Sequence, residues 1–403
     1  MMKDPYHCGM DAGSWPTALG NSWNSRVSSS TATARGKSLW SVPLPGRAAG
    51  GITVTADGQV FVTSGNHLTA VKDGRIKWSV QIRALGSPVA LTQGRLITNE
   101  IGSLTIRDQA TGTCIASFPA GGLGTPAITS EEHIVYIHCS KTDNPRLLRI
   151  DMSGEVVWSR QLSQRSTYPP LLVMDLIVVG DGSYCRAYDR DGVLRWIANR
   201  NGFQLPGSTR HSDLATAQDG SADEVRTPVI RFGSKLILVG FRWSAGSGFF
   251  VFDLGEHNVR PLRTHLPMRG PVAAPQIPSE RSRLVAVGRL KQDNHGYFQP
   301  TVVTVDRHGD ILWTYQTSVE MHAIAADAAG KIFIAGSPSV TRWEQYHSAP
   351  LYNQKEECFV HGFNHDGEQL FTWYAPGPIS APLAIGANGE LLVVSEGRLW
   401  AIG

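Results

Sequence analysis

The sequence contains few cysteines, a modest share of charged residues and no long apolar run. Its five cysteines lie far apart and include no CxxC pair, a usage that favours reduced thiols and a cytoplasmic location. No apolar segment approaches the ~20 residues of a membrane-spanning helix. Residues 1–20 lack the apolar core of a secretory signal. The formal charge of +3 on 403 residues is too small to favour nucleic acid or a membrane surface as partner.

Several common catalytic motifs are also missing. The chain has neither a Gly-rich nucleotide loop opening a helix nor an HExxH motif. Residues 244–248 (Ser-Ala-Gly-Ser-Gly) lack the strand–turn–helix setting of a nucleophilic serine. His361 and His365 fall in an expected strand and its turn, where residues four apart lie far from each other. We therefore expect structural roles for both and no metal site.

Glycine is abundant, with 42 residues, and part of it belongs to a repeated phrase. In six places an aromatic residue follows a glycine by four positions: Trp40 after Gly36, Trp78 after Gly74, Trp158 after Gly154, Trp196 after Gly192, Trp313 after Gly309 and Phe371 after Gly367. Two more copies keep the glycine and lose the aromatic, at Ala116 after Gly112 and at Val259 after Gly255. Eight copies predict a repeat fold rather than two or three separate domains.

Each copy of the phrase indicates a β-hairpin. The glycine permits the positive φ of a tight turn, and the aromatic on the following strand can bury a large flat surface between sheets. A second hairpin precedes the phrase, as in residues 52–62 and 323–334. Each unit is therefore expected to form four antiparallel strands, A to D, with the aromatic residue on strand D.

The two ends of the chain predict how the repeat closes. Residues 381–402 supply only strands A, B and C, whereas the phrase at Trp40 has no such strands before it. We predict an all-β, eight-bladed β-propeller over residues 36–403, in which the N-terminal strand around Trp40 completes the C-terminal blade and removes open edges. Residues 1–35 are expected to form an arm that straps across the propeller. A β-sandwich with coincidental spacing is the alternative.

The phrase resembles the repeat of a known family. Leu-x-x-x-Asp-x-x-Gly-x-x-x-Trp, with Trp15 before a polar stretch, is similar to the pyrroloquinoline-quinone-type propeller repeat of quinoprotein alcohol dehydrogenases and of the outer-membrane assembly lipoprotein. The resemblance implies the fold and leaves activity to be argued from the site. The quinone enzymes use a disulfide between adjacent cysteines and a calcium ion. This chain has no Cys-Cys pair, so we expect neither quinone nor calcium; Cys8 lacks the apolar stretch of a lipoprotein signal.

The later units of the repeat are longer than the earlier ones. Markers from Trp40 to Trp196 lie 38 to 42 residues apart, and later ones 54 to 63. The extra residues fall in a blade linker, residues 200–222, and in expected B–C loops at 241–248, 289–300 and 337–357. B–C loops and D-to-A linkers emerge on the same face, so we predict one elaborated binding face. Its expected substrate-binding residues in these loops are Arg242, Trp243, His295, Trp343, Tyr346 and His347.

A second set of residues precedes each strand A and is expected to line the channel mouth on that face. It comprises Arg83, Arg165, Tyr168, Glu224, Arg226, Arg269, Glu320 and His322. Converging guanidinium groups would attract a carboxylate or phosphate. His322, with Glu320 and Glu224, supplies candidate acid–base groups near neutral pH. The alternative is that these arginines pair with the glutamates in structural salt bridges.

Two classes of function fit this sequence. The favoured hypothesis is a cofactor-independent enzyme of lyase, cyclase or hydrolase type, acting on a small anionic or aromatic substrate at the elaborated face. The alternative is a non-catalytic scaffold propeller that recognises a protein or peptide on the same face. Neither hypothesis predicts a nucleic-acid or membrane partner.

Overall fold

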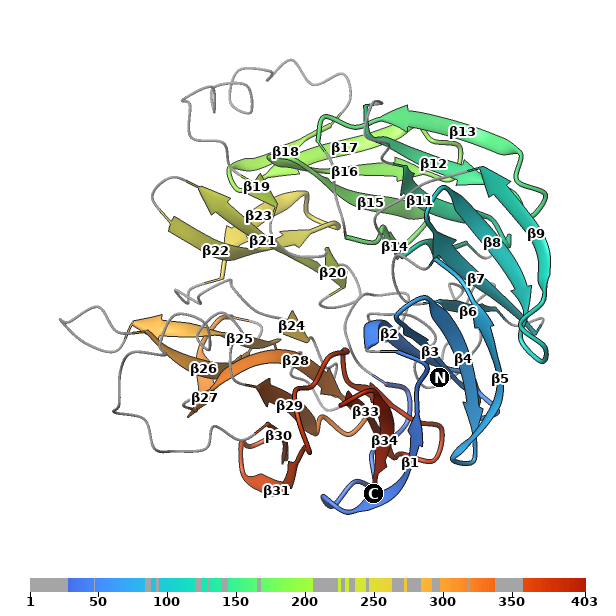
Figure 1. The fold of residues 1–403 in the computed structure, drawn as a ribbon. Coiled ribbons are helices and arrows are strands. Elements are labelled where there is room, and N and C mark those ends of the chain that lie inside the picture. Colours follow the sequence, from blue (N-terminus) through green and yellow to red (C-terminus); the bar gives the residue numbers. More distant parts are fainter. Residues whose placement is uncertain are drawn as a thin grey trace, which may run out of the picture.

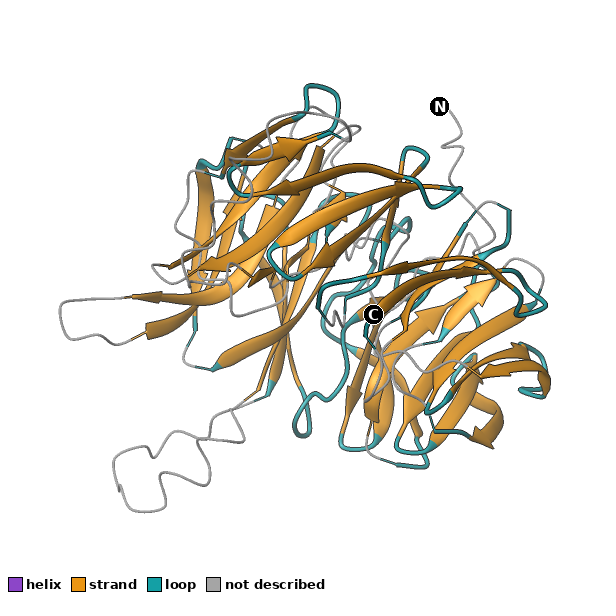
Figure 2. Ribbon diagram, turned by 90° about the horizontal axis from the view of Figure 1, so that it is seen from above, coloured by secondary structure: helices purple, strands orange, loops and turns teal. Residues whose placement is uncertain are grey.

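The computed structural model contains strands, turns and loops, and no helix among its described residues (Figures 1 and 2). It describes residues 28–403 apart from 47, 84–87, 92–93, 120–124, 130, 139–143, 165–167, 206–223, 226–228, 232–235, 244–245, 263–271, 274–283, 292–297, 307, 318 and 338–357. A search of this part of the chain finds no helix long and apolar enough to cross a membrane.

The first four sheets follow one another in chain order. Sheet 1 contains β2 (Ala48–Val54), β3 (Val60–Ser64), β4 (His67–Lys72) and β5 (Arg75–Gln81). Sheet 2 contains β6 (Val89–Leu91), β7 (Arg95–Glu100), β8 (Ser103–Asp108) and β9 (Cys114–Pro119). Sheet 3 contains β10 (Ala127–Ile128), β11 (Ile134–His138), β12 (Arg146–Ile150) and β13 (Val156–Gln161). Sheet 4 contains β14 (Leu171–Val173), β15 (Leu176–Asp181), β16 (Tyr184–Asp189), β17 (Leu194–Asn199) and β18 (Gly202–Gln204).

The second half of the chain continues the pattern. Sheet 5 contains β19 (Glu224–Val225), β20 (Ile230–Arg231), β21 (Leu236–Trp243), β22 (Gly246–Asp253) and β23 (Asn258–Pro261). Sheet 6 contains β24 (Val272–Ala273), β25 (Leu284–Lys291), β26 (Phe298–Val305) and β27 (Ile311–Gln316). Sheet 7 contains β28 (Glu320–Ala326), β29 (Ile332–Ser337), β30 (Phe359–Phe363) and β31 (Gln369–Tyr374). Sheet 8 contains β32 (Ala384–Ile385), β33 (Leu391–Ser395), β34 (Arg398–Ile402) and β1 (Ser38–Pro43).

The expected four-stranded antiparallel sheet is present six times in the described residues. In sheet 4 the extra strand β18 pairs with the outer edge of β17, through Asn199 opposite Gly202. In sheet 5 the first strand is divided, because β19 and β20 both pair with β21. The architecture is propeller-like, with β1 beside β34 although they lie at opposite ends of the sequence (Figure 1).

The glycine-to-aromatic phrase forms contacts between neighbouring sheets. A Cβ built on Gly74 would lie 3.0 Å from the Trp40 ring, and one on Gly112 would lie 2.7 Å from the Trp78 ring. The indole Nε1 of Trp78 donates to the Gln109 carbonyl in the turn that holds Gly112, at 3.0 Å. The aromatic residue of one sheet therefore packs on the turn glycine of the next, which has a positive φ and no room for a side chain.

The two copies that lack the aromatic at the expected position differ in what takes its place. In sheet 2, Phe118 takes the place expected at Ala116, and its ring lies where a Cβ on Gly154 would be. In sheet 5 the positive φ belongs to His257 rather than to Gly255. The position expected to hold the sheet 5 aromatic is Val259, which packs against the apolar cluster of sheets 4 and 5.

The expected B–C loops of sheets 5 and 6 are strand over most of their described residues. Residues 241–248 were expected to form a loop, yet β21 continues to Trp243 and β22 begins at Gly246. Of residues 289–300, residues 289–291 belong to β25 and residues 298–300 to β26, and the six between them lie outside the described residues. The described residues of these segments pair with each other across the hairpin, so this part of each insertion extends the sheet.

Candidate functional site

The candidate site is the face that carries the B–C connections, called here the B–C face. In sheets 1, 2, 4 and 8 these connections are two-residue turns, for example between Ser64 and His67. In sheets 5 and 6 the connected strands are eight residues long, whereas the second and third strands of the other six sheets have five or six. We call the pairs β21–β22 and β25–β26 the long hairpins.

The last described register pairs of the long hairpins show which residues lie opposite each other near the B–C face. Arg242 lies opposite Ser247, and Trp243 opposite Gly246. In the second hairpin, Lys291 lies opposite Phe298. The backbone of Glu224, on β19, lies opposite Arg242. Two of the residues predicted from the sequence, Glu224 and Arg242, therefore lie opposite each other on the adjacent strands β19 and β21.

His322 is the bulged residue of β28. The register of β28 with β29 shifts between Met321 and Ala323, and both of these neighbours are buried whereas His322 keeps an exposed surface. Its Nε2 lies 3.1 Å from the carbonyl oxygen of Ile379. A carbonyl only accepts, so the proton of the neutral ring lies on Nε2. Protein packed around the ring disfavours its charged form and lowers the pKa of His322 below its usual value.

Ile379 belongs to the linker between sheets 7 and 8, which is held from several sides. Its N–H donates to Ser337 Oγ at 3.1 Å, and Ser395 Oγ donates to the Gly377 carbonyl at 2.7 Å. Cys358, directly before β30, is a buried free thiol whose pKa is raised, mainly because burial disfavours the thiolate. A thiol held in this form is a weak nucleophile. The linker is held in place by two other contacts. His322 Nε2 binds the Ile379 carbonyl, and Ser337 Oγ accepts the Ile379 N–H.

Arg83 lies on the B–C face and is exposed. Its carbonyl accepts the N–H of Ile101, in the turn between β7 and β8, at 2.9 Å. The acidic group at this turn, Glu100, is already paired: Arg107 Nη2 lies 2.7 Å from Glu100 Oε1, and both side chains are nearly buried. The Glu100 carboxylate is thus neutralised by Arg107 from its own sheet.

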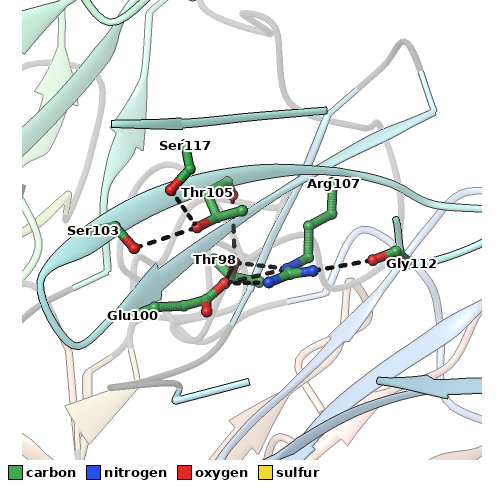
Figure 3. A network of polar contacts seen from close by, with 7 residues as sticks. All are labelled: Thr98, Glu100, Ser103, Thr105, Arg107, Gly112 and Ser117. Carbon is green, nitrogen blue, oxygen red and sulfur yellow. Dashed lines mark hydrogen bonds and ion pairs between the residues drawn. The ribbon is translucent and has the colours of Figure 1, made fainter. Parts of the chain in front are cut away.

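Figure 3 shows the polar network around this ion pair. Thr98 Oγ1 donates to Glu100 Oε1 at 2.7 Å, and Arg107 Nη1 donates to the Gly112 carbonyl at 3.1 Å. Thr105 continues the network to the hydroxyl groups of Ser103 and Ser117. None of these residues is among the site residues predicted from the sequence. Their signal was the alternation of polar residues along β7 and β8, which places them on one side of the sheet.

The remaining predicted residues divide into two groups. Tyr168 is described and partly buried, and the backbones of Glu224, Glu320, Arg242 and Trp243 are described as parts of strands. Seven lie outside the described residues: Arg165, Arg226, Arg269, His295, Trp343, Tyr346 and His347. The convergence of arginines at a channel mouth therefore stays a prediction.

The histidine pair of the C-terminal half has separate environments. His361 is buried, and its Nε2 lies 3.2 Å from the hydroxyl of Tyr315 on sheet 6 while its Nδ1 lies 2.9 Å from Thr372 Oγ1. Burial lowers the pKa of His361 to about 4. His365 lies in the following turn beside Asp366, at 3.1 Å. Over the described ranges, no three His, Cys, Asp or Glu side chains gather as a metal-binding group.

The fold and the inter-sheet packing define a protein built of pyrroloquinoline-quinone-type propeller repeats. A sequence model of the family described as outer membrane protein assembly factor BamB matches residues 24–115 and 100–247, more than half of the chain. The chain belongs to this family.

Solved structures agree on the fold. BamB from Moraxella catarrhalis is 16% identical, with a TM-score of 0.58, over 91% of this chain and 98% of that chain. The WD40 domain of SCAP from fission yeast is 9% identical, with a TM-score of 0.52, over 90% of this chain and 97% of that chain. A search of curated proteins finds no match. At these identities the likeness concerns architecture alone.

Proposed function

We propose that this chain is a closed eight-bladed propeller that binds a protein partner through the long hairpins of its B–C face. The observation that carries the proposal is the length of those hairpins. Each strand of the long hairpins has eight residues, whereas the second and third strands of the other sheets have five or six. At about 3.3 Å per residue, two to three added residues extend each hairpin by roughly 7–10 Å.

The closure of the ring is supported by the contacts between the two ends of the chain. β1 pairs with β34 from Ser38 to Pro43, and Gly36 packs on the ring of Phe371 in sheet 7. The first strand thus repeats the inter-sheet contact made elsewhere by the phrase. A closed ring fixes the spacing of neighbouring blades, so adjacent hairpins project as one rigid surface.

The residues at the hairpin ends favour a protein surface with acidic groups. Arg242 and Trp243 stand in the last two described pairs of one hairpin, and Lys291 and Phe298 form the last described pair of the other. Arginine and aromatic residues are enriched at the centres of protein interfaces, and positive charge there selects partners of opposite charge. The family description, an assembly factor, fits a protein-binding role.

The enzyme hypothesis has weaker support. Its central residue, His322, uses Nε2 to bind the backbone of Ile379. The hypothesis of a small-molecule substrate therefore stays a prediction of the sequence, as do the absence of a quinone and the cytoplasmic location. If His322→Ala abolished a measured turnover while leaving the fold intact, the enzyme hypothesis would replace this proposal.

A photo-cross-linking experiment tests the proposal. A photoreactive phenylalanine analogue is placed at position 242 or 291, and at position 153 in a control variant, and each variant is irradiated in cells of the natural host. Ser153 is exposed on the opposite side of the sheets, in the turn between β12 and β13. We expect one discrete protein adduct from positions 242 and 291 and none from 153. Equal labelling at all three positions, or none at the hairpins, would refute the proposal.

A further inference from the structure

A short N-terminal segment, residues 28–35 and called here the strap, runs across two turns on the side opposite the B–C face. Ser28, Ala32 and Ala34 are buried, whereas Ser29 and Thr31 between them are exposed. This alternation is typical of an extended chain with one side against a protein surface. Ala32 and Ala34 belong to an apolar cluster formed with buried residues of sheets 7, 8 and 1.

The first turn under the strap joins β28 to β29 and binds the main chain of the strap. Asp327, 1% exposed, accepts the N–H of Ala32 on Oδ2 at 2.8 Å, and Lys331 Nζ donates to the Ala32 carbonyl at 2.7 Å. The carbonyl of Ala326 accepts the Ser28 N–H at 2.9 Å. A buried carboxylate and an ammonium group thus hold both polar groups of one strap residue.

The second turn under the strap joins β32 to β33. The Gly389 carbonyl accepts the N–H of Thr33 at 2.8 Å. Gly389 has a φ of +81°, and a Cβ there would overlap the carbonyl oxygen of Thr31. The lack of a side chain at Gly389 therefore leaves the space in which the strap backbone lies.

These contacts recognise backbone groups and small side chains, and they require little else of the strap. We propose that the groove between the two turns is a peptide-binding site whose ligand is an extended segment with Ala or Ser at alternate positions, and that the strap is its resident ligand in cis. The chemistry of the ligand follows from the occupant: small side chains at the positions of 28, 32 and 34, and a free N–H and carbonyl at 32. A partner segment of this kind competes with the strap for Asp327.

This site is separate from the proposed function. Both turns connect a first strand to a second strand, so they lie on the side away from the long hairpins. The cis strap has a high effective concentration, which a competing segment must overcome. The test therefore weakens the strap and leaves the groove intact.

The probe is a fluorescent peptide with the sequence of residues 28–35, and the protein is the full chain carrying Ala32→Glu. A buried carboxylate at position 32 beside Asp327 should displace the cis strap. We expect saturable binding of the peptide to this variant, about tenfold or more tighter than to the wild type. The same peptide carrying Ala32→Glu should not bind, and Asp327→Ala added to the protein should remove binding. Equal binding of both peptides, or no binding by a variant with wild-type circular dichroism, would overturn the proposal.

A second measurement covers the case in which Ala32→Glu does not fold. Hydrogen exchange of the wild type should show the amides of Ala32 and Thr33 exchanging through local opening, about a hundredfold faster than those of β33. If these amides exchange only with global unfolding, the strap is not displaceable and the proposal fails.

Discussion

The packing of turn glycines on aromatic rings predicts a specific difference between two glycines of sheet 2. Gly112 has a φ of +74° and Gly94 one of +68°, so alanine at either position pays a similar backbone cost, about 1 kcal/mol. A Cβ on Gly112 would lie 2.7 Å from the Trp78 ring, whereas one on Gly94 would meet nothing within 4 Å. The Trp78 ring cannot move freely, because its Nε1 is bound to Gln109 in the same turn.

The steric overlap at Gly112 should add about 1–3 kcal/mol, the usual cost of overpacking. We therefore expect Gly112→Ala to lower the free energy of unfolding by about 2–4 kcal/mol and Gly94→Ala by about 1 kcal/mol. Urea unfolding followed by tryptophan fluorescence measures both. Equal destabilisation by the two substitutions would show that the ring does not pack on the turn, and would refute this account of the repeat.

Three further predictions concern buried polar groups. The pKa of His361 is about 4 in the folded chain, below the 6.5 of an unfolded histidine, so its contribution to the free energy of unfolding is full above pH 6.5 and should fall by about 3 kcal/mol towards pH 4. In His361→Gln the urea midpoint should therefore depend less on pH over this range, and an unchanged pH dependence would contradict the assignment. Asp327→Ala should lower the thermal midpoint more than Asp151→Ala, which removes a similar turn carboxylate without a strap contact; equal shifts would mean that the strap contact contributes nothing. Arg107→Ala should cost about 3 kcal/mol in urea unfolding, and a second substitution, Glu100→Leu, should restore part of it; a double variant less stable than the single one would refute the ion-pair argument.

The repeat was predictable because its determinants are local in sequence. A glycine turn and an aromatic residue four positions later lie on one hairpin, so their spacing survives in the printed chain. The pairing of β1 with β34 also followed from counting strands at each end. Six of the sheets have the four strands that the pattern predicts.

Features that depend on contacts between units were not predictable. Phe118 replaces the aromatic expected two positions earlier, because a neighbouring residue on the same side of a strand can reach the next turn. Phe203 lies on the added strand β18, 5.1 Å from Trp196 and 5.5 Å from Phe252 in the next sheet. Only the three-dimensional register shows that this strand exists.

The place of the long hairpins in the repeat was predictable from the sequence, whereas their form was not. The extra residues of sheets 5 and 6 do lie on the B–C face, as their place in the repeat indicated. The marker spacing had assigned the extra residues, among them 241–248, to loops. Pairing such as Phe241 with Gly248 instead continues the strands. A hairpin presents a more rigid surface than a loop, which favours docking of a protein over enclosure of a small molecule.

The central claim is that the long hairpins bind a protein partner, and shortening one of them tests it most directly. Replacing residues 242–247 by Asn-Gly closes the hairpin with a two-residue turn at the pair Phe241–Gly248. In the remainder of sheet 5 it removes only the pairing of Glu224 with Arg242 and keeps that of Val225 with Phe241. We expect the affinity of the shortened variant for the partner cross-linked at position 291 to fall about tenfold or more, with the thermal midpoint of unfolding unchanged. Unchanged affinity in this shortened variant would contradict the claim.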